Sequence, residues 1–567
     1  MPPTALKENK RPKKRRVPKV LITSALPYAN GALHFGHIAG AYLPADCYAR
    51  FCRLRGDDVL FICGSDEYGI PITINAEMAG RTPQQHVDIF HKVNKDLFAQ
   101  LRMSFDNYSR TSWKGHIPTV QEFFTDLLNN GYIEPRTTKQ LYSEKDGRFL
   151  ADRYVTGTCP KCGFDAARGD ECPKCAASYE ATDLINPRSK ISGGPLVAKP
   201  TKHWFLRFDL FAEKLREWIA TKNWKPSVTH FAMSYVDDLK ARAITRDGEW
   251  GVPIPLPDTE GKVLYVWFDA PIGYISATKE GFPDTWQNYW LKDDVQYVQF
   301  LGKDNIPFHA VFFPAMVMGQ NKPYKQVDDI AANEFLNLEG RQFSKSDGWT
   351  IDLDRFFEHF TADQIRYVLA ANAPETQDSE FTWKDFQTRC NSELLGKYGN
   401  LANRVLVFIA NKAEGRVPEQ EFDTDFINKV KELAKLAAEA YSTYHLRKAS
   451  QLVMEIAAAG NVYFDGEKPW KIEDPAKKGK VLRSCLECLK ILALVSSPIV
   501  PDAAQKLWQM LGQKEALSKE NWDAVLKTPL KAGLALPKPE VLFKRVEDAI
   551  IQEEIDKLAI LTAQKQG

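Results

Sequence analysis

Short apolar runs that each end in a polar loop constrain the fold of this 567-residue chain more than any other feature. The first run covers residues 19–26, and it is followed by the turn sequence PYANG and by a helical pattern from about residue 36 to 55. A second run, DVLFICGSDE, comes next. Strand, loop, helix and strand in this order are typical of a parallel α/β sheet, whose ligands bind at the carboxyl ends of the strands.

This pattern is interrupted once and later replaced. The helical signal fades at about residue 133, where short strands, turns and four cysteines appear, and a helix is expected again at 206–222. The segments KVLYVWFDAPIGYIS and VQYVQFLGKDN then restore the apolar runs, so we expect one sheet domain split by an insertion. From about residue 350 onward amphipathic helical patterns dominate, which predicts a separate helical domain.

The overall composition excludes a disordered, collagen-like or membrane-spanning chain. Apolar residues make up 44% of the chain and charged residues 26%, as in an ordinary globular protein. No run of about 18 apolar residues is present, so no membrane span is expected. Ten cysteines are few for this length, and we expect a reducing, cytoplasmic location.

Charge is unevenly distributed along the chain. The net charge is +2, but the first 19 residues carry eight Lys and Arg against one Glu, which leaves a net −5 on the rest. Three interpretations of this basic tail stay open: a solvated leader, an arm that attracts nucleic acid, or a nuclear targeting signal in the run PKKRRV.

The strongest local motif is CPKC-x9-CPKC, which contains Cys159, Cys162, Cys172 and Cys175. Two CxxC knuckles at this spacing favour tetrahedral Zn²⁺ bound by four thiolates. No open coordination position is implied, so we expect a structural zinc site rather than a catalytic one.

Two further motifs carry groups that suit phosphate. In LHFGH, Gly36 lets the backbone approach a ligand, and His34 and His37 can donate to a triphosphate at a helix N-terminus. In GRQFSKSDG, residues 340–348, a cationic and hydroxyl-rich loop lies between glycines. Each motif taken alone fits ordinary surface histidines or a solvated turn as well.

Taken together, and in this order, the two motifs resemble the HIGH and KMSKS signatures of class I aminoacyl-tRNA synthetases. Longer segments narrow the resemblance to the methionyl-tRNA synthetase family: ALPYANGALHFGH, FICGSDEYGIPI, VWFDAPIGYIS, FLGKDNIPFHA, the four-cysteine insertion, GNLANR (399–404) and KPW (468–470). The resemblance covers about residues 19 to 550. The chain departs from the two signatures at Phe35, Gln342, Phe343 and Asp347, but it keeps Lys345.

The resemblance implies a ligase that activates L-methionine with ATP to methionyl-adenylate and pyrophosphate, and then transfers methionine to the 3′ end of initiator and elongator tRNA(Met). It implies a Rossmann-like α/β catalytic domain with a zinc-bearing insertion, followed by an all-α anticodon-binding bundle. The expected boundaries are a basic tail 1–18, the first catalytic half 19–132, the insertion 133–238, the second catalytic half 239–335, a signature-loop region that contacts the tRNA stem 336–385, the anticodon domain 386–550 and a C-terminal tail 551–567.

The same resemblance assigns roles to individual residues. The catalytic residues would be His34, His37 and Lys345. ATP, accompanied by Mg²⁺, would be bound by His34, Gly36, His37, Lys303, Asp304, Ser344, Lys345 and Ser346. Methionine would be bound by Ala25, Leu26, Tyr28, Asp66, Trp267, Ala270, Pro271, Tyr274 and His309, with Asp66 on the ammonium group. The anticodon would be bound by Asn400, Arg404 and Trp470.

Two alternatives differ from this assignment in observable ways. Class I ligases for Ile, Val or Leu usually carry a larger editing insertion than the short, metal-knuckled one here. A catalytically silent tRNA-binding relative would not need His34, His37, Asp66 and Lys345. Some family members add a dimerising C-terminal domain, for which this chain has no room, so a monomer is expected.

Overall fold

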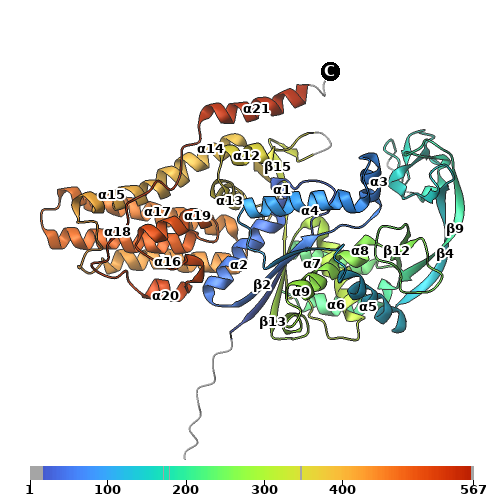
Figure 1. Cartoon of the computed structure of the whole chain (residues 1–567), viewed down its shortest axis with the longest axis horizontal. Coiled ribbons are helices and arrows are strands. Elements are labelled where there is room, and N and C mark those ends of the chain that lie inside the picture. The colour runs from blue at the N-terminus through green and yellow to red at the C-terminus, as the bar shows by residue number, and fades with distance from the viewer. Residues whose placement is uncertain (1–16, 170, 176, 178, 345–347, 564–567) are drawn as a thin grey trace, which may run out of the picture.

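The computed structural model describes residues 17–169, 171–175, 177, 179–344 and 348–563. Figure 1 shows a helical bundle at one end, the long strands β4 (Ile133–Ser143) and β9 (Leu196–Leu206) at the other, and a central sheet between them. Within the described ranges, no helix is long and apolar enough to cross a membrane.

The centre of the molecule is a five-stranded parallel sheet with the strand order β14-β13-β1-β2-β3. Its strands are β1 (Lys19–Ser24), β2 (Asp58–Ser65), β3 (Asn107–Arg110), β13 (Val295–Gly302) and β14 (Asp329–Asn333). The two halves of the sheet, separated in sequence by the insertion, meet where β1 pairs with β13. The strand order reverses at this pair, and such a reversal is where open α/β sheets bind ligands. The predicted fold class is confirmed.

One continuous helical run follows β1 at this switch point. It consists of α1 (Phe35–His37), a π-helical segment Ile38–Tyr42 and α2 (Leu43–Arg55), and it ends at Gly56, whose φ of 90° suits a glycine C-cap. The remaining helices of the first catalytic half are α3 (Ile70–Met78), α4 (Pro83–Gln100) and α5 (His116–Asn129). The second half contributes α8 (Val266–Asp269), α9 (Gly273–Gly281), α10 (Gln287–Trp290), a π-helical segment Phe308–Phe312 and α11 (Phe313–Met318).

The insertion is mostly antiparallel strand. β4 and β9 pair along their whole length, and β5 (Arg148–Phe149) and β10 (Arg242–Ala243) extend their sheet. The cysteine-bearing part contains β6 (Val155–Thr158), β7 (Ala167–Arg168) and β8 (Ile185–Ser189). The helix expected at 206–222 begins later, because β9 continues to Leu206 and a short turn precedes α6 (Ala212–Ala220). The segment ends with α7 (Pro226–Asp237), β11 (Thr245–Asp247) and β12 (Lys262–Leu264).

After residue 350 the described chain contains one short strand, β17 (Ser379–Phe381), which pairs with β15 (Leu336–Leu338); β15 also pairs with β16 (Arg341–Gln342). The helices that follow are α12 (Leu353–His359), α13 (Ala362–Ala371), α14 (Trp383–Arg389), a π-helical segment Cys390–Gly399, α15 (Asn400–Lys412), α16 (Thr424–Ser442), α17 (Leu446–Glu467), α18 (Pro475–Ser496), α19 (Pro501–Met510), α20 (Trp522–Lys527) and α21 (Asp548–Ala563). In α18 every residue from 481 to 496 is buried, so this helix forms the centre of the bundle.

Sheet and bundle share one hydrophobic core. Val20 and Ile22 of β1 belong to the same cluster as the bundle, whereas Leu21 faces a second cluster on the opposite side of the sheet. Alternate residues of a strand point to opposite faces, so one short strand contributes to both cores. The C-terminal helix α21 also returns to the signature-loop region, where Arg355 of α12 pairs with Glu554 (2.9 Å).

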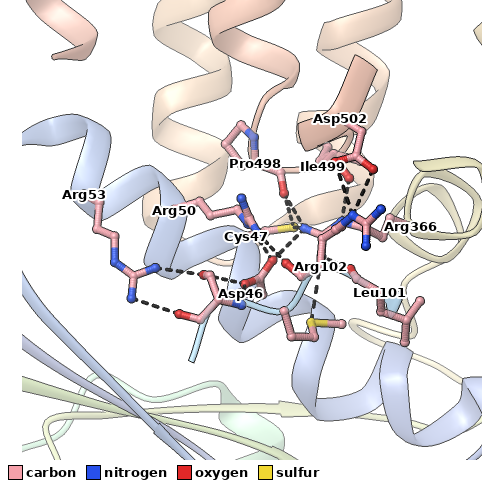
Figure 2. Close-up of polar contacts among 12 residues, drawn as sticks. Asp46, Cys47, Arg50, Arg53, Leu101, Arg102, Arg366, Pro498, Ile499 and Asp502 are labelled. Carbon is pink, nitrogen blue, oxygen red and sulfur yellow. Dashed lines mark hydrogen bonds and ion pairs between the residues drawn. The ribbon is translucent and has the colours of Figure 1, made fainter. Parts of the chain in front are cut away.

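A buried ion pair joins α2 of the sheet domain to α13, and its arginine also reaches the bundle (Figure 2). Arg366 of α13 and Asp46 of α2 lie 2.7 Å apart, and both side chains are fully buried. The Arg366 guanidinium also donates to the carbonyl oxygens of Ile499 (2.9 Å), Pro498 (2.7 Å) and Leu101 (3.0 Å). Burial alone would raise the pKa of Asp46, but Arg50 and Arg366 hold that pKa well below its ordinary value.

Candidate active site

The helix N-terminus that follows β1 brings two histidines together. The backbone N–H of His34 donates to Nδ1 of His37 (3.2 Å), and the two ring centroids lie 3.7 Å apart. A Cβ at Gly36 would lie 2.9 Å from Nδ1 of His34 and 3.3 Å from the carbonyl oxygen of Leu336. A larger residue at this position would therefore displace the His34 ring.

The second signature motif approaches the first in space. The ring of Phe343 stacks on His34, with centroids 4.6 Å apart and planes at 4°. The residue that departs from the family pattern at position 343 thus supplies an aromatic contact between the two motifs. The backbone N–H of Ser344 donates to the carbonyl oxygen of Trp349 (2.9 Å). Lys345, Ser346 and Asp347 lie outside the described residues.

One cavity of about 1910 Å³ unites most of the predicted site. Its lining includes His34, Gly36, His37 and Asp304 from the predicted ATP set, together with all nine residues of the predicted methionine set: Ala25, Leu26, Tyr28, Asp66, Trp267, Ala270, Pro271, Tyr274 and His309. Lys303 and Ser344 are not among the described residues that line it. Lys303 pairs instead with Glu334 (2.6 Å) and Asp378 (2.9 Å).

The polar end of the methionine set is a fixed hydrogen-bonded chain. Nδ1 of His309 lies 2.9 Å from the carbonyl oxygen of Asn305, which can only accept, so this nitrogen carries the proton. Nε2 therefore accepts from the hydroxyl of Tyr274 (2.8 Å). Burial lowers the pKa of His309 to about 4, so its ring is neutral at pH 7.

Asp66 directly follows β2, and its carboxylate is buried. One carboxylate oxygen, Oδ1, accepts no hydrogen bond within the part of the chain that the structure describes. Burial raises the pKa of Asp66 well above its ordinary value, and the nearby Asp269 raises it further. Its backbone is held, since its N–H donates to Pro27 (2.9 Å) and its carbonyl accepts from Ala29 (2.8 Å).

Trp267 is an aromatic lining residue of this cavity that stays partly exposed. Its ring stacks on Phe308, with centroids 3.8 Å apart and planes at 11°, and 36% of the residue is exposed. Phe308 begins the π-helical segment that contains His309. The other two π-helical segments adjoin His37 and Asn400, so each of them borders a predicted site. π-helical distortions of a helix are common at functional sites, and the sequence pattern of a helix does not reveal them.

The four cysteines of the insertion form a cluster that could hold a metal ion. Their sulfur atoms all lie within 4.8 Å of one another. The backbone N–H groups of Lys161 and Cys162 point at Sγ of Cys159 (3.4 and 3.5 Å), which would stabilise a thiolate there. The arrangement fits a closed site of four sulfur ligands.

The predicted anticodon residues lie on α15 and just after α17, and none of them is among the described residues that line the cavity. Asn400 and Arg404 lie one helical turn apart on α15, and both of these polar residues are at least partly accessible. The Arg404 guanidinium pairs with Asp465 of α17 and lies over the ring of Phe464, 5.1 Å from its centroid. Trp470 is 47% exposed and contacts the same Phe464 ring, with centroids 5.7 Å apart.

Sequence reasoning missed three acidic residues at these sites. Glu67 and Asp269 are fully buried next to residues of the predicted methionine set. Asp465 forms an ion pair with Arg404. Glu67 and Asp269 each lie within a segment that carried the family resemblance, so their position at a strand or helix end could have identified them. Asp465 has no such signal, because its partner lies on another helix.

Comparisons with protein families match nearly the whole chain. Residues 20–406 match the family described as tRNA synthetases class I (M). Residues 413–560 match the family described as the anticodon binding domain of methionyl tRNA ligase.

Individual proteins give the same result. The methionine–tRNA ligase of Protochlamydia amoebophila is 62% identical over 561 residues, which are 97% of this chain and 80% of the relative. The methionine–tRNA ligase of Chlamydia abortus is 52% identical, and the alignment covers 93% of this chain and 100% of that protein. Among solved structures, Mycobacterium tuberculosis methionyl-tRNA synthetase in complex with methionyl-adenylate has a TM-score of 0.77 at 28% identity, covering 94% of this chain and 100% of that one.

Proposed function

The chain belongs to the class I methionyl-tRNA synthetase family, and on that premise we propose how its residues divide the reaction. It is a methionine–tRNA ligase, which activates L-methionine with ATP to methionyl-adenylate and then transfers methionine to tRNA. The observation that carries this conclusion is the 62% identity over 97% of the chain to a relative named for this activity.

We propose that the cavity at the β1–β13 switch point binds methionine at its enclosed end. Asp66 would receive the ammonium group, because its buried Oδ1 has no other donor in the described chain. Tyr274 and the neutral His309 would form the polar wall, and Trp267 would close the apolar side against the thioether. Sulfur bonds weakly, so shape and sulfur–aromatic contact must supply much of the selectivity.

For the first step we propose that His34 and His37 contact the phosphates of ATP and that Lys345 holds the pyrophosphate side. Gly36, Asp304, Ser344 and Ser346 would complete the nucleotide contacts. The methionine carboxylate is already an anion, so its attack on the α-phosphorus requires no protein base. The residues act by positioning the reactants and by stabilising charge that develops on phosphate. Mg²⁺ would accompany ATP as part of the substrate. Lys303 would contact ATP from outside the cavity lining, because its ammonium group is paired with Glu334 and Asp378.

Zn²⁺ is the metal that we propose for the cysteine cluster. Cys159, Cys162, Cys172 and Cys175 would bind it as four thiolates. The surrounding core is small, with Leu141, Leu150 and Val155 among its few buried side chains, so a bound ion would supply a large part of the local stability.

For the second step we propose that Asn400, Arg404 and Trp470 read the anticodon, with Trp470 stacking on an unpaired base. The proposed domains 19–132, 133–238, 239–335, 336–385 and 386–550 would place anticodon binding in a different domain from methionine activation.

We further propose that the protein acts in the cytoplasm as a monomer; sedimentation analysis tests the oligomeric state. A role for the basic tail 1–18 in attracting tRNA would appear as a lower salt dependence of tRNA binding once it is deleted.

ATP–pyrophosphate exchange with a panel of amino acids tests the proposed specificity. We expect exchange that depends on methionine and is absent with isoleucine, valine and leucine. Exchange with one of those three would indicate a sibling ligase. Tight tRNA binding by a folded protein without any exchange would indicate a catalytically silent relative.

A further inference from the structure

A second carboxylate is buried directly beside Asp66 but does not line the cavity. The side chain of Glu67 is fully buried and accepts three hydrogen bonds. Ser65 Oγ donates to its Oε1 (2.6 Å), while Ser112 Oγ (2.5 Å) and Arg110 Nε (2.7 Å) donate to its Oε2. The carboxylate is therefore held from two sides, by residues at or just after the carboxyl ends of β2 and β3.

The backbone of Glu67 is fixed as well. Its N–H donates to Oγ1 of Thr111 (2.9 Å), and its carbonyl oxygen accepts from Nε1 of Trp250 (2.7 Å). Thr111 belongs to the first catalytic half, whereas Trp250 follows the insertion in sequence. The loop that begins with Ser65 and contains Asp66 is consequently anchored by both halves of the catalytic domain.

Burial and hydrogen bonding act on the Glu67 carboxylate in opposite directions. Burial raises the pKa of Glu67 above its ordinary value, and Arg110 and the two serine hydroxyls oppose that rise without cancelling it. His91, whose Nδ1 lies 3.5 Å from Oε1, adds no charge, because burial lowers its pKa to about 4. A buried ion pair costs solvation energy that hydrophobic residues would not, so it is weak evidence for stability alone. The short, directional hydrogen bonds of the Glu67 carboxylate instead fix the position of the loop that carries it.

We propose that Glu67 is a positioning residue for methionine: it holds the loop that presents Asp66 to the ammonium group of the substrate. The inference rests on the proposed ammonium-binding role of Asp66. The Asp66 carboxylate accepts a hydrogen bond from the backbone N–H of Tyr68, and its Oδ1 accepts none from the described residues, so its aim depends on the backbone on either side. A shift of about 1 Å in a substrate-binding group can cost a large factor in rate or affinity.

The variant Glu67→Gln tests this, because it keeps the shape of the side chain and removes the charge that Arg110 and the serines bind. In methionine-dependent pyrophosphate exchange we expect the KM for methionine to rise about tenfold, as for the loss of hydrogen bonds to a charged group. The KM for ATP should stay within about twofold of the wild type, because a local shift of Asp66 leaves the HFGH segment in place.

A matched control is Asp88→Asn. Asp88 binds the same guanidinium at Nη2 (2.6 Å), but its side chain is half exposed and does not touch the Asp66 loop. This variant should leave both KM values within about twofold of the wild type. If Glu67→Gln does not fold, Ser112→Ala removes one bond to the same carboxylate and should raise the KM for methionine about threefold.

Asp66→Asn, measured in parallel, separates two kinds of failure. If Asp66→Asn raises the KM for methionine and Glu67→Gln leaves it unchanged, the positioning role is wrong. If Glu67→Gln raises the KM values for methionine and ATP equally, Glu67 supports the whole domain and the inference is overturned. If Asp66→Asn itself leaves methionine binding unchanged, the proposed role of Asp66 fails, and this inference fails with it.

Discussion

The cavity proposed to bind methionine and the end of the bundle proposed to bind the anticodon differ in how buried their residues are. The cavity lies at strand ends and combines buried aromatics with buried polar groups such as Asp66 and the Tyr274–His309 pair. The anticodon end uses helix surfaces, where Arg404 and Trp470 are accessible and Arg404 is paired with Asp465. A buried site must be assembled during folding, because unpartnered polar groups inside a protein are costly. An exposed site can instead exchange its partners when a base arrives.

The largest expected effect lies at the junction between the two regions. Replacing Arg366 with Met leaves Asp46 buried with only Arg50 as its charged partner, so the free energy of unfolding should fall by about 3–5 kcal/mol. Denaturant unfolding measures this. Arg102→Met is the control, because the Arg102–Asp502 pair is half exposed and should contribute less than about 1 kcal/mol. Equal losses in the two variants would show that the buried pair does not join the regions.

The next effect tests the cavity alone. His37→Ala removes one of the two donors proposed for the phosphates of ATP, so the rate of pyrophosphate exchange should fall about 100- to 1000-fold. Binding of tRNA should stay unchanged, since the anticodon end lies on other helices. Stopped-flow or steady-state exchange, combined with a filter-binding assay for tRNA, measures both. An exchange rate near the wild-type value would remove His37 from the catalytic set.

A smaller effect tests the anticodon end. Trp470→Ala removes the exposed stacking plane, and kcat/KM for both initiator and elongator tRNA should fall about 5- to 150-fold, as expected for about 1–3 kcal/mol per stacked base. Aminoacylation kinetics measure this fall. Because Trp470 contacts Phe464 and is not among the described residues that line the cavity, exchange should remain normal. Unchanged charging would show that the anticodon is read elsewhere.

The smallest effect concerns one bond inside the cavity. Tyr274→Phe removes the hydroxyl that donates to His309 while keeping the ring, so the KM for methionine should rise about three- to tenfold. Titration of methionine in the exchange assay determines this KM. If the KM for ATP rises by the same factor, the bond shapes the cavity as a whole rather than its methionine end.

The two regions also differ in how far the sequence could predict them. Every residue predicted for methionine lines one cavity, because long motifs marked the strand ends that meet at the switch point. The stacking of Phe343 on His34 could not be predicted, since it joins distant segments through space. Lys303 was grouped with ATP by its motif, but its pairing with Glu334 and Asp378 depends on two other segments.

At the anticodon end the sequence supplied residue types without their partners. GNLANR predicted Asn400 and Arg404 on one helix face, and KPW predicted an accessible Trp470, which is 47% exposed. The pairing of Arg404 with Asp465 depends on how α15 and α17 pack, and no local pattern encodes that packing. The π-helical segment that precedes Asn400 was missed as well, because no residue type in it marks the change from i→i+4 to i→i+5 hydrogen bonding.

The central claim is that the two regions perform separable steps, and one paired measurement tests it most directly. Methionine-dependent pyrophosphate exchange without tRNA and aminoacylation of tRNA(Met) are measured on the same preparations of His37→Ala and Trp470→Ala. We predict that His37→Ala loses both activities and that Trp470→Ala loses only aminoacylation. Equal loss of both activities in both variants would contradict the claim.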